Sequence, residues 1–337
     1  MRTPWRRYLF RVAVGSGATG AFLWLFLREV DLHEAWREIT ALPGWTMLAA
    51  LGLIIVNVGF MTLRWKYLLS GAGYTIRKRK LFSTVSVGRA ANNILPARGG
   101  DLLRIESMRE QHVPAFVAAG TLFAERLLDG VVLSVWILLG ALMIGEGGPI
   151  LLTGIGLSAG SAVGVLLVGL AARDSERTEG FIWRATRWLP PRWHTRAARA
   201  AAHFVEGLGA FRGRKRVFLV FATSAGMWLA DVAMYYIVGQ AFDIEIGVGG
   251  FFLLEGVGNL ALAVPATAAG IGTFDYLTLV AAKGIDIPTD TATAYVITMH
   301  ALTVLPITII GAVLIRPAFP RLFRRAAREH EPAKETA

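Results

Sequence analysis

Apolar residues in this chain gather in blocks that are long enough to cross a lipid bilayer. A hydrocarbon core of about 30 Å requires about 20 helical residues. Six uninterrupted blocks come close to or exceed that length, and each predicts a transmembrane helix: Phe10–Leu27, Gly44–Leu63, Pro114–Ile144, Pro149–Ala172, Val217–Gly239 and Thr291–Ile315. The pattern therefore predicts an all-α membrane protein with six full spans.

Two further apolar stretches, Leu81–Pro96 and Val248–Ala282, are interrupted by proline, glycine and polar residues. We expect each to enter the membrane and return to the side from which it came, as re-entrant hairpins over residues 81–112 and 248–283. If the hairpins instead cross fully as helix pairs, the sidedness of the loops is unchanged but the breaks move to the opposite surface.

Composition agrees with a membrane protein. Hydrophobic residues make up 54% of the 337 residues and charged residues 18%, and the mean hydropathy is +0.51, whereas a soluble domain has about 25% charged residues. The chain has no cysteine, which excludes disulfides, thiolate chemistry and cysteine-based metal sites. The net charge is +11, and the basic residues stand beside the apolar blocks. We therefore expect the protein to bind anionic lipid headgroups and not nucleic acid.

The basic residues fall on one side of the predicted spans. Residues 1–11, 64–80, 98–112, 173–216 and 316–337 hold 30 of the 35 Lys and Arg residues. Because cytoplasmic loops accumulate Lys and Arg, both termini are predicted to be cytoplasmic, in an inner (cytoplasmic) membrane. The first block is interpreted as a retained helix and not as a cleaved signal peptide. The Arg- and Trp-rich loop 173–216 predicts an interfacial amphipathic helix, with a partner-binding element as the alternative.

The order of spans and hairpins repeats. Residues 1–145 and 149–316 each contain three spans and one hairpin, so the second repeat would be inverted, and residues 317–337 would form a basic cytoplasmic tail. Both breaks place Asn before an apolar run, then Pro, a pair of glycines and Asp. Such paired breaks indicate the binding site of a transporter. The alternative is two hairpins that share a turn composition by chance.

The helix starts that follow the breaks favour an anion. Unpaired N–H groups and the positive end of the helix dipole bind phosphate well, and Asp101 and Thr273 are expected to cap these helices. Nearby arginines could add bidentate contacts, although Asp101 and Arg104 could equally be a cap and a cytoplasmic charge. The predicted headgroup contacts are Arg89, Asn92, Asn93, Pro96, Arg98, Gly99, Gly100, Asp101, Arg104, Asn259, Pro265, Gly270, Gly272 and Asp275.

Several ionisable residues lie inside predicted spans or hairpins, where each costs several kcal/mol unless it is paired or hydrated. They are Glu125, Arg126, Asp129, Asp231, Glu255 and His300. A structural ion pair between Arg126 and one of the neighbouring acids is one interpretation, and proton coupling or headgroup contact is the other. His300 could titrate near neutral pH or could simply be hydrogen-bonded.

The motifs of common enzymes are missing from the sequence: it has no Walker loop, no His-Glu-x-x-His and no Gly-x-Ser-x-Gly. We therefore expect a lipid transporter with no cofactor and no enzymatic activity. Two rival hypotheses remain. One is a membrane enzyme of lipid metabolism that uses Glu125, Asp129 or Asp101 as acid or base. The other is a scaffold that presents lipid to a separate lipid-modifying enzyme.

Three motifs in order resemble a known family. The first break, from Asn92 to Arg104, resembles the Asn…Leu-Pro-x-Arg-x-Gly-Glu-x-x-Arg signature of the flippase-like family, also called the lysylphosphatidylglycerol synthase transmembrane region. Glu125-Arg126-x-x-Asp129 is similar to its Glu-Arg-x-x-Asp element, and residues 265–275 are similar to its Pro-x-x-x-Gly-Gly-x-Gly-x-x-Glu signature.

The resemblance covers roughly residues 8–316 and implies a protein that moves or handles amphiphilic lipids, such as aminoacylated phosphatidylglycerol, isoprenoid-linked sugars or hopanoid-type lipids. This sequence departs from the signatures in having Asp101 and Asp275 where Glu is usual and Ala269 where Gly is frequent. A soluble aminoacyl-transfer domain is not expected, because the chain ends about 20 residues after the last predicted span. The resemblance thus implies a lipid flippase without lysyl transfer.

Overall fold

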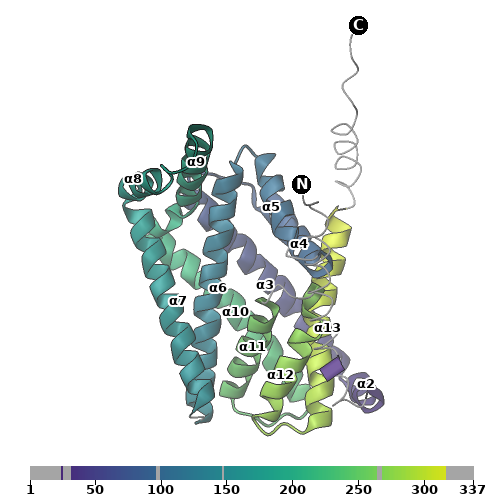
Figure 1. The fold of residues 1–337 in the computed structure, drawn as a ribbon. Coiled ribbons are helices and arrows are strands. Elements are labelled where there is room, and N and C mark those ends of the chain that lie inside the picture. Colours follow the sequence, from purple (N-terminus) through teal and green to yellow (C-terminus); the bar gives the residue numbers. More distant parts are fainter. Residues whose placement is uncertain (1–23, 26–31, 96–98, 146–147, 264–267, 316–337) are drawn as a thin grey trace, which may run out of the picture.

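A computed structural model of the chain describes residues 24–25, 32–95, 99–145, 148–263 and 268–315, and the regular structure of these residues is helical (Figure 1). The elements are α2 (Leu32–Ala41), α3 (Gly44–Gly71), α4 (Lys78–Ile94), α5 (Gly99–Arg109), α6 (Ala115–Ile144), α7 (Pro149–Arg173), α8 (Ser175–Ala185), α9 (Pro191–Gly207), η2 (Gly209–Arg212), α10 (Arg214–Ala241), α11 (Val248–Ala263), η3 (Ala268–Gly270), α12 (Thr273–Lys283) and α13 (Thr289–Ile315).

Among the residues that the structure describes, five helices are long and apolar enough to span a membrane: α3, α6, α7 (from Leu151), α10 and α13. They correspond to five of the six predicted spans. The sixth, Phe10–Leu27, lies outside the described residues except for positions 24–25, as do both termini and the basic tail. Helix α3 runs eight residues past the predicted end at Leu63, because Trp65, Leu68 and Leu69 extend its buried face. The short helix α2 was not predicted.

The two interrupted stretches form helical hairpins that enter the bundle from opposite ends. Helices α4 and α5 pack antiparallel in one hairpin, and α11 and α12 pack antiparallel in the other. Figure 1 shows α4 and α5 in the upper part of the bundle and α11 and α12 in the lower part. We call the described residues beside each break the tips: 92–95 and 99–101 in the first hairpin, and 268–275 in the second. Helix α4 contacts the η3 turn, so the first hairpin reaches the tip of the second.

Packing relates the two halves of the chain. Helix α3 packs along α10 at the centre, α4 packs on α13, and α11 packs on α6, so each hairpin lies against the long helix that ends the other half. Glycines allow these crossings: a Cβ at Gly311 of α13 would lie 2.3 Å from Ala90 of α4, and one at Gly140 of α6 would lie 2.8 Å from the carbonyl oxygen of Gly249 in α11. The close approach fixes both hairpins against their partners.

The predicted helix caps differ in detail. Asp101 is the third residue of α5, so it lies inside the first turn. Gly272, with φ 83°, precedes α12, and Asp275 accepts a bond from its backbone N–H, so Thr273 begins the helix instead of capping it. Only glycine adopts this left-handed backbone without cost.

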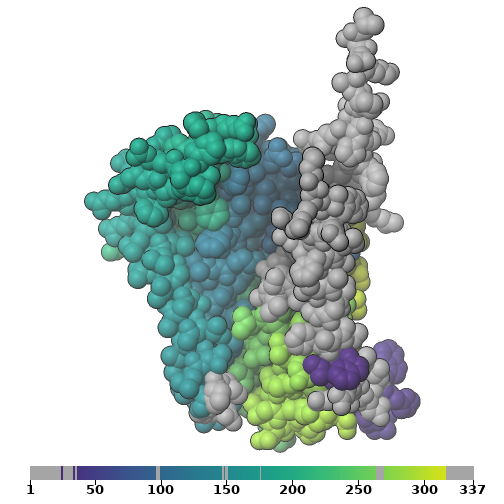
Figure 2. Space-filling view, in the orientation of Figure 1, coloured from purple at the N-terminus to yellow at the C-terminus, as the bar shows by residue number. Residues whose placement is uncertain are grey.

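The loop 173–216 forms two helices, α8 and α9, followed by the η2 turn, and Figure 2 shows α8 and α9 as a ledge at one end of the bundle. Its exposed aromatic residues are Phe181, Trp183, Trp188 and Trp193. The structure thus replaces the single predicted amphipathic helix with a helical pair.

Candidate functional site

Charged side chains from six helices gather where the first hairpin tip meets the core. The cations are Arg64, Arg89, Arg104 and Arg126, and the acids are Asp101, Glu125, Asp129, Asp231 and Glu255. Since each isolated charge is costly inside a membrane, the pairing of these groups decides what the centre can bind.

Both terminal nitrogens of the Arg104 guanidinium are paired with one carboxylate of the protein. Its guanidinium donates two hydrogen bonds to Glu125, at 2.8 and 2.9 Å, and both side chains are almost completely buried. It also lies 4.1 Å from the ring centre of Trp65, whose indole N–H donates to Thr121. A bidentate pair stacked on an aromatic ring holds α3, α5 and α6 together.

A second chain of ion pairs runs through Asp101 and Asp129. Arg126 donates to Asp101 at 3.3 Å and to Asp129 at 3.3 Å, and Arg64 donates to the other oxygen of Asp129 at 2.6 Å. Asn92 of α4 donates to Asp101 at 3.2 Å. The Arg126 side chain is 39% exposed whereas that of Arg64 is 1% exposed, so Arg126 is the member of this chain that a ligand can reach.

Arg89 differs from the other three central arginines. Its guanidinium donates to the sulfur of Met61 at 3.2 Å, a weak acceptor, and no carboxylate in the described part of the chain forms an ion pair with it. It lines a cavity of about 20 Å³ together with Asn57 and Asp231, a space for about one water molecule. The charge of Arg89 is therefore balanced by carboxylates that it does not contact directly, of which Asp231 acts most strongly.

Two interior acids lack a cationic hydrogen-bond partner among the described residues. Asp231 accepts from the amide of Asn57 at 2.8 Å. Glu255 is fully buried, accepts from Asn259 at 3.2 Å through one oxygen, and leaves its other oxygen without a partner. Asp231 and Glu255, in the second half of the chain, both interact electrostatically with Asp129 in the first half. The polar centre therefore includes residues of both halves.

The second tip has its own polar cluster. His300 Nδ1 lies 2.6 Å from Asp275 Oδ1, and its Nε2 lies 3.0 Å from the carbonyl oxygen of Ala269. Thr273 donates to the carbonyl of Gly270 and shapes the turn. Asn93 of the first hairpin donates to Thr308 of α13 at 2.9 Å, so α13 contacts polar residues of both hairpins.

The two tips share one arrangement. In each half, an aspartate in the first turn of the returning hairpin helix bonds to a basic residue 25 positions later on the next long helix: Asp101 to Arg126, and Asp275 to His300. Each basic residue also lies eleven positions after the first residue of its helix. The halves therefore repeat the geometry while exchanging arginine for histidine.

The structure brings most of the predicted headgroup residues to the two tips, but it gives them internal partners. A Cβ at Gly100 would lie 1.9 Å from the carbonyl oxygen of Gly88, so α4 covers the start of α5, and Asp101 brings its own carboxylate to the place where an external anion was expected. Gly99 packs against Leu95, and Gly270 has a φ of 77°. Pro96, Arg98 and Pro265 lie outside the described residues.

Arg64 and Asn57 are central residues that sequence reasoning did not select. The sequence predicts a cytoplasmic loop at Arg64, but this residue is buried in α3 and paired with Asp129. The apolar residues Trp65, Leu68 and Leu69 could have indicated that the helix continues. Asn57 sits in an apolar run whose composition gives no sign of its partner, Asp231.

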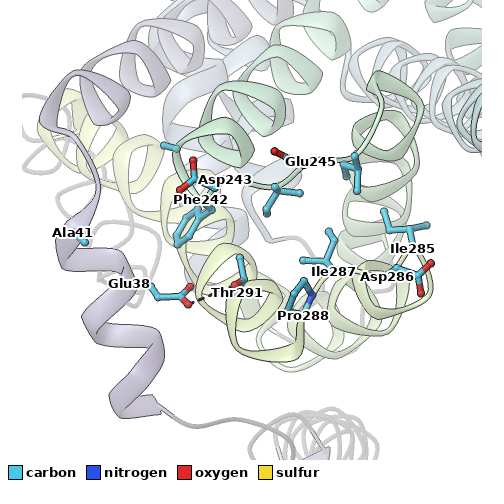
Figure 3. Close-up of a pocket in the computed structure, with 13 residues that line it drawn as sticks. Glu38, Ala41, Phe242, Asp243, Glu245, Ile285, Asp286, Ile287, Pro288 and Thr291 are labelled. Carbon is cyan, nitrogen blue, oxygen red and sulfur yellow. Dashed lines mark hydrogen bonds between the residues drawn. The ribbon is translucent and has the colours of Figure 1, made fainter.

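A hollow lies at the other end of the bundle from the α8–α9 ledge. It has a volume of about 650 Å³ and is lined by the ends of α2, α10, α12 and α13 (Figure 3). Figure 3 shows Glu38 next to Thr291, with Asp243, Glu245 and Asp286 around the rim. Burial and the nearby Glu34 raise the pKa of Glu38 above its ordinary value. A hollow with four carboxylates repels anions, so it does not suit an anionic headgroup.

The fold and its charged centre define a multi-pass helical integral membrane protein. The chain belongs to the family described as the lysylphosphatidylglycerol synthase TM region, which matches residues 8–311. This match confirms the resemblance that the three motifs indicated.

Curated relatives are distant. Glycosyltransferase AglD of Haloferax volcanii is 25% identical over 82% of this chain, and the chain spans about half (50%) of that relative's length. UPF0104 membrane proteins of Methanothermobacter thermautotrophicus and Methanocaldococcus jannaschii are 23% and 21% identical, over 80% of this chain and 83% and 84% of their own lengths.

The expectation of no enzymatic activity is contradicted by these relatives. A protein named as a glycosyltransferase contains a region similar to most of this chain. The absence of familiar catalytic motifs is therefore not a sufficient reason to exclude enzymatic activity.

Proposed function

We propose that this protein moves a lipid with an anionic, phosphate-bearing headgroup between the leaflets of the membrane. The observation that carries the proposal is Arg89, an arginine of the interior beside the first hairpin tip, without an ion pair from the described residues. A cation at this depth is costly unless a partner compensates it. A phosphate group that enters when the two halves open around this cavity would supply that partner and would make bidentate hydrogen bonds with the guanidinium.

Arg126 would be the second headgroup contact. Its side chain is 39% exposed and its two bonds to Asp101 are long, at 3.3 Å. A phosphate approaching the tip could therefore replace Asp101 as its partner. Arg104 has no such role in this proposal, because Glu125 already occupies its guanidinium.

Transport would use the two halves as an inverted repeat, residues 1–145 and 149–316, with hairpins that re-enter from opposite sides. The equal 25-residue spacing of the Asp101–Arg126 and Asp275–His300 pairs supports this symmetry. The reciprocal packing of α4 on α13 and of α11 on α6 supports it too. Rocking of one half against the other would then open the centre to each leaflet in turn, while the lipid tails stay in the bilayer.

The proposed location is the inner (cytoplasmic) membrane, with the α8–α9 ledge on the cytoplasmic side. The excess of Lys and Arg in the loops at that end supports this orientation. The acidic hollow would face the outside. A separate lipid-modifying enzyme that makes or consumes the lipid is the proposed protein partner.

The experiment is leaflet exchange of fluorescent lipids in vesicles that contain the purified protein. We expect exchange of phosphate-bearing anionic lipids, such as phosphatidylglycerol or an isoprenyl phosphate, to exceed that in protein-free vesicles, and exchange of a neutral glycolipid to remain at the protein-free rate. Equal rates with and without protein for every lipid would show that the proposal is wrong.

A second candidate function is glycosyl transfer to a membrane lipid, favoured by the similarity to AglD. Its test is to incubate the purified protein with sugar donors and an isoprenyl phosphate acceptor. A glycosylated lipid product would favour transfer, whereas exchange without product would favour transport. Glu125 and Asp129 are held by Arg104 and Arg64, so an acid–base role would fall on another carboxylate, such as Glu255.

A further inference from the structure

The contacts of His300 fix how many protons its site holds. Its Nε2 faces the carbonyl oxygen of Ala269 at 3.0 Å, and a carbonyl oxygen only accepts, so Nε2 must carry a hydrogen. Its Nδ1 faces Asp275 Oδ1 at 2.6 Å, and this contact also needs a hydrogen, on the ring or on the carboxyl group. The pair therefore holds one proton more than a neutral imidazole and an ionised carboxylate.

The environment of Asp275 indicates where that proton lies. Its second oxygen, Oδ2, accepts the backbone N–H of Gly272 at 2.8 Å. Both oxygens of Asp275 therefore accept hydrogen bonds when the shared hydrogen is on the ring. In this arrangement the His300 ring donates from both nitrogens and bridges the start of α12 and the η3 turn.

We infer that His300 is a proton-binding site whose proton ties the tip of the second hairpin to α13. When the proton leaves, the ring has one N–H for two acceptors and must lose its bond either to Ala269 or to Asp275. The bond to Ala269 is the one that we expect to break, because Ala269 adopts a strained left-handed backbone with φ 55°. Deprotonation would therefore release the tip.

Among the described residues, Asp275 is the charged group in contact with the ring. Phe274 of α12 packs against it with ring centres 4.9 Å apart. Charged groups on the other helices that pack against α13 have partners other than His300. Glu38 of α2 bonds to Thr291, and Arg64 of α3 bonds to Asp129. Arg89 of α4 contacts Met61 and interacts with Asp231, and Asp231 of α10 bonds to Asn57.

The first half shows what the site would be without a titratable residue. At the equivalent position Arg126 bonds to Asp101 and keeps its charge at any physiological pH. The exchange of arginine for histidine therefore makes one tip permanently paired and the other proton-dependent. If the proposed lipid transport is correct, on which this step rests, the proton at His300 would be the ion that couples to opening of the second tip.

The absence of native cysteine allows a direct test that does not require transport. Ile271 at the second tip and Ile94 at the first are both exposed, so Ile271→Cys and Ile94→Cys give matched reporters of tip opening. The measurement is the rate of labelling by a small maleimide in detergent-solubilised protein between about pH 5 and 8, the range in which histidine changes its charge. The ratio of the two rates cancels the intrinsic pH dependence of the thiol.

We expect the Ile271-to-Ile94 ratio to rise with pH by up to about tenfold per pH unit, the slope of one released proton. In the His300→Arg background the ratio should stay low and constant. If this variant does not fold, His300→Gln should also give a pH-independent ratio.

A constant ratio in the otherwise wild-type protein, or an equal rise in the His300 variants, would overturn the inference. Because the assay follows the tip and not the lipid, a pH-dependent ratio together with absent leaflet exchange would reject the proposed transport while leaving the proton site standing.

Discussion

At the scale of single residues, the structure separates arginines that hold the protein together from arginines that can meet a ligand. Arg104 and Arg64 are buried in short ion pairs, whereas Arg89 contacts a methionine sulfur and Arg126 is partly exposed. The sequence could select most of these residues, because charges stand out in apolar runs. It could not assign their partners, since Arg104–Glu125 and Arg64–Asp129 join different helices and depend on how those helices pack.

The Arg104–Glu125 pair gives a stability prediction. Glu125→Gln leaves a buried guanidinium without its carboxylate, so we expect a loss of about 3–5 kcal/mol, measured as thermal unfolding in detergent. The matched control is Glu106→Gln on α5, which removes an exposed ion pair with Arg109 and should cost less than about 1 kcal/mol. Equal effects of the two substitutions would contradict the structural role of the buried pair.

At the scale of helices, long apolar runs predicted the five long helices, and glycine and proline interruptions predicted the two hairpins. These patterns did not predict where every helix ends. The sequence predicts that the span ends at Leu63, before Arg64, because a charge usually marks the membrane boundary. Burial of that charge against Asp129 removes the boundary and lets the helix continue to Gly71. The packing of α4 on α13 and of α11 on α6 likewise involves residues too distant in the chain for local patterns to reveal.

The contact between α4 and α13 depends on Gly311. A valine there would place its Cβ 2.3 Å from Ala90 and 2.8 Å from the carbonyl oxygen of Ser86, so Gly311→Val should cost at least about 1–3 kcal/mol through overpacking. Gly160→Val on α7, where no atom lies within 4 Å of the added Cβ, is the control and should leave thermal unfolding unchanged. An unaffected Gly311→Val protein would show that the two helices do not pack this closely.

At the scale of the whole molecule, we propose two halves with opposite orientation around a polar centre. The charge bias and the equal 25-residue spacing of the two tip pairs support this proposal. The sequence predicts an inverted repeat from a few residues shared by the two breaks. It could not show that Arg126 and His300 make equivalent contacts, because the motifs at the two breaks end before these helix positions. That difference depends on the fold.

The orientation is testable with single cysteines, since the chain has none of its own. Arg192→Cys lies on the exposed surface of α9, and Glu245→Cys lies in the exposed loop between α10 and α11. In intact cells a membrane-impermeant maleimide should label Glu245→Cys, while Arg192→Cys should react only after permeabilisation. The reverse pattern would invert the proposed topology.

The most direct test of the account is leaflet exchange by the Arg89→Gln variant in vesicles, beside the wild type and the surface control Arg192→Gln. The glutamine retains hydrogen-bonding capacity but lacks the charge that a phosphate would compensate. We predict at least about a tenfold loss of anionic-lipid exchange, as expected when a charge-assisted contact of about 1.5–3 kcal/mol is removed, with wild-type exchange in the control. Exchange by Arg89→Gln at the wild-type rate would contradict the claim that this arginine binds the headgroup.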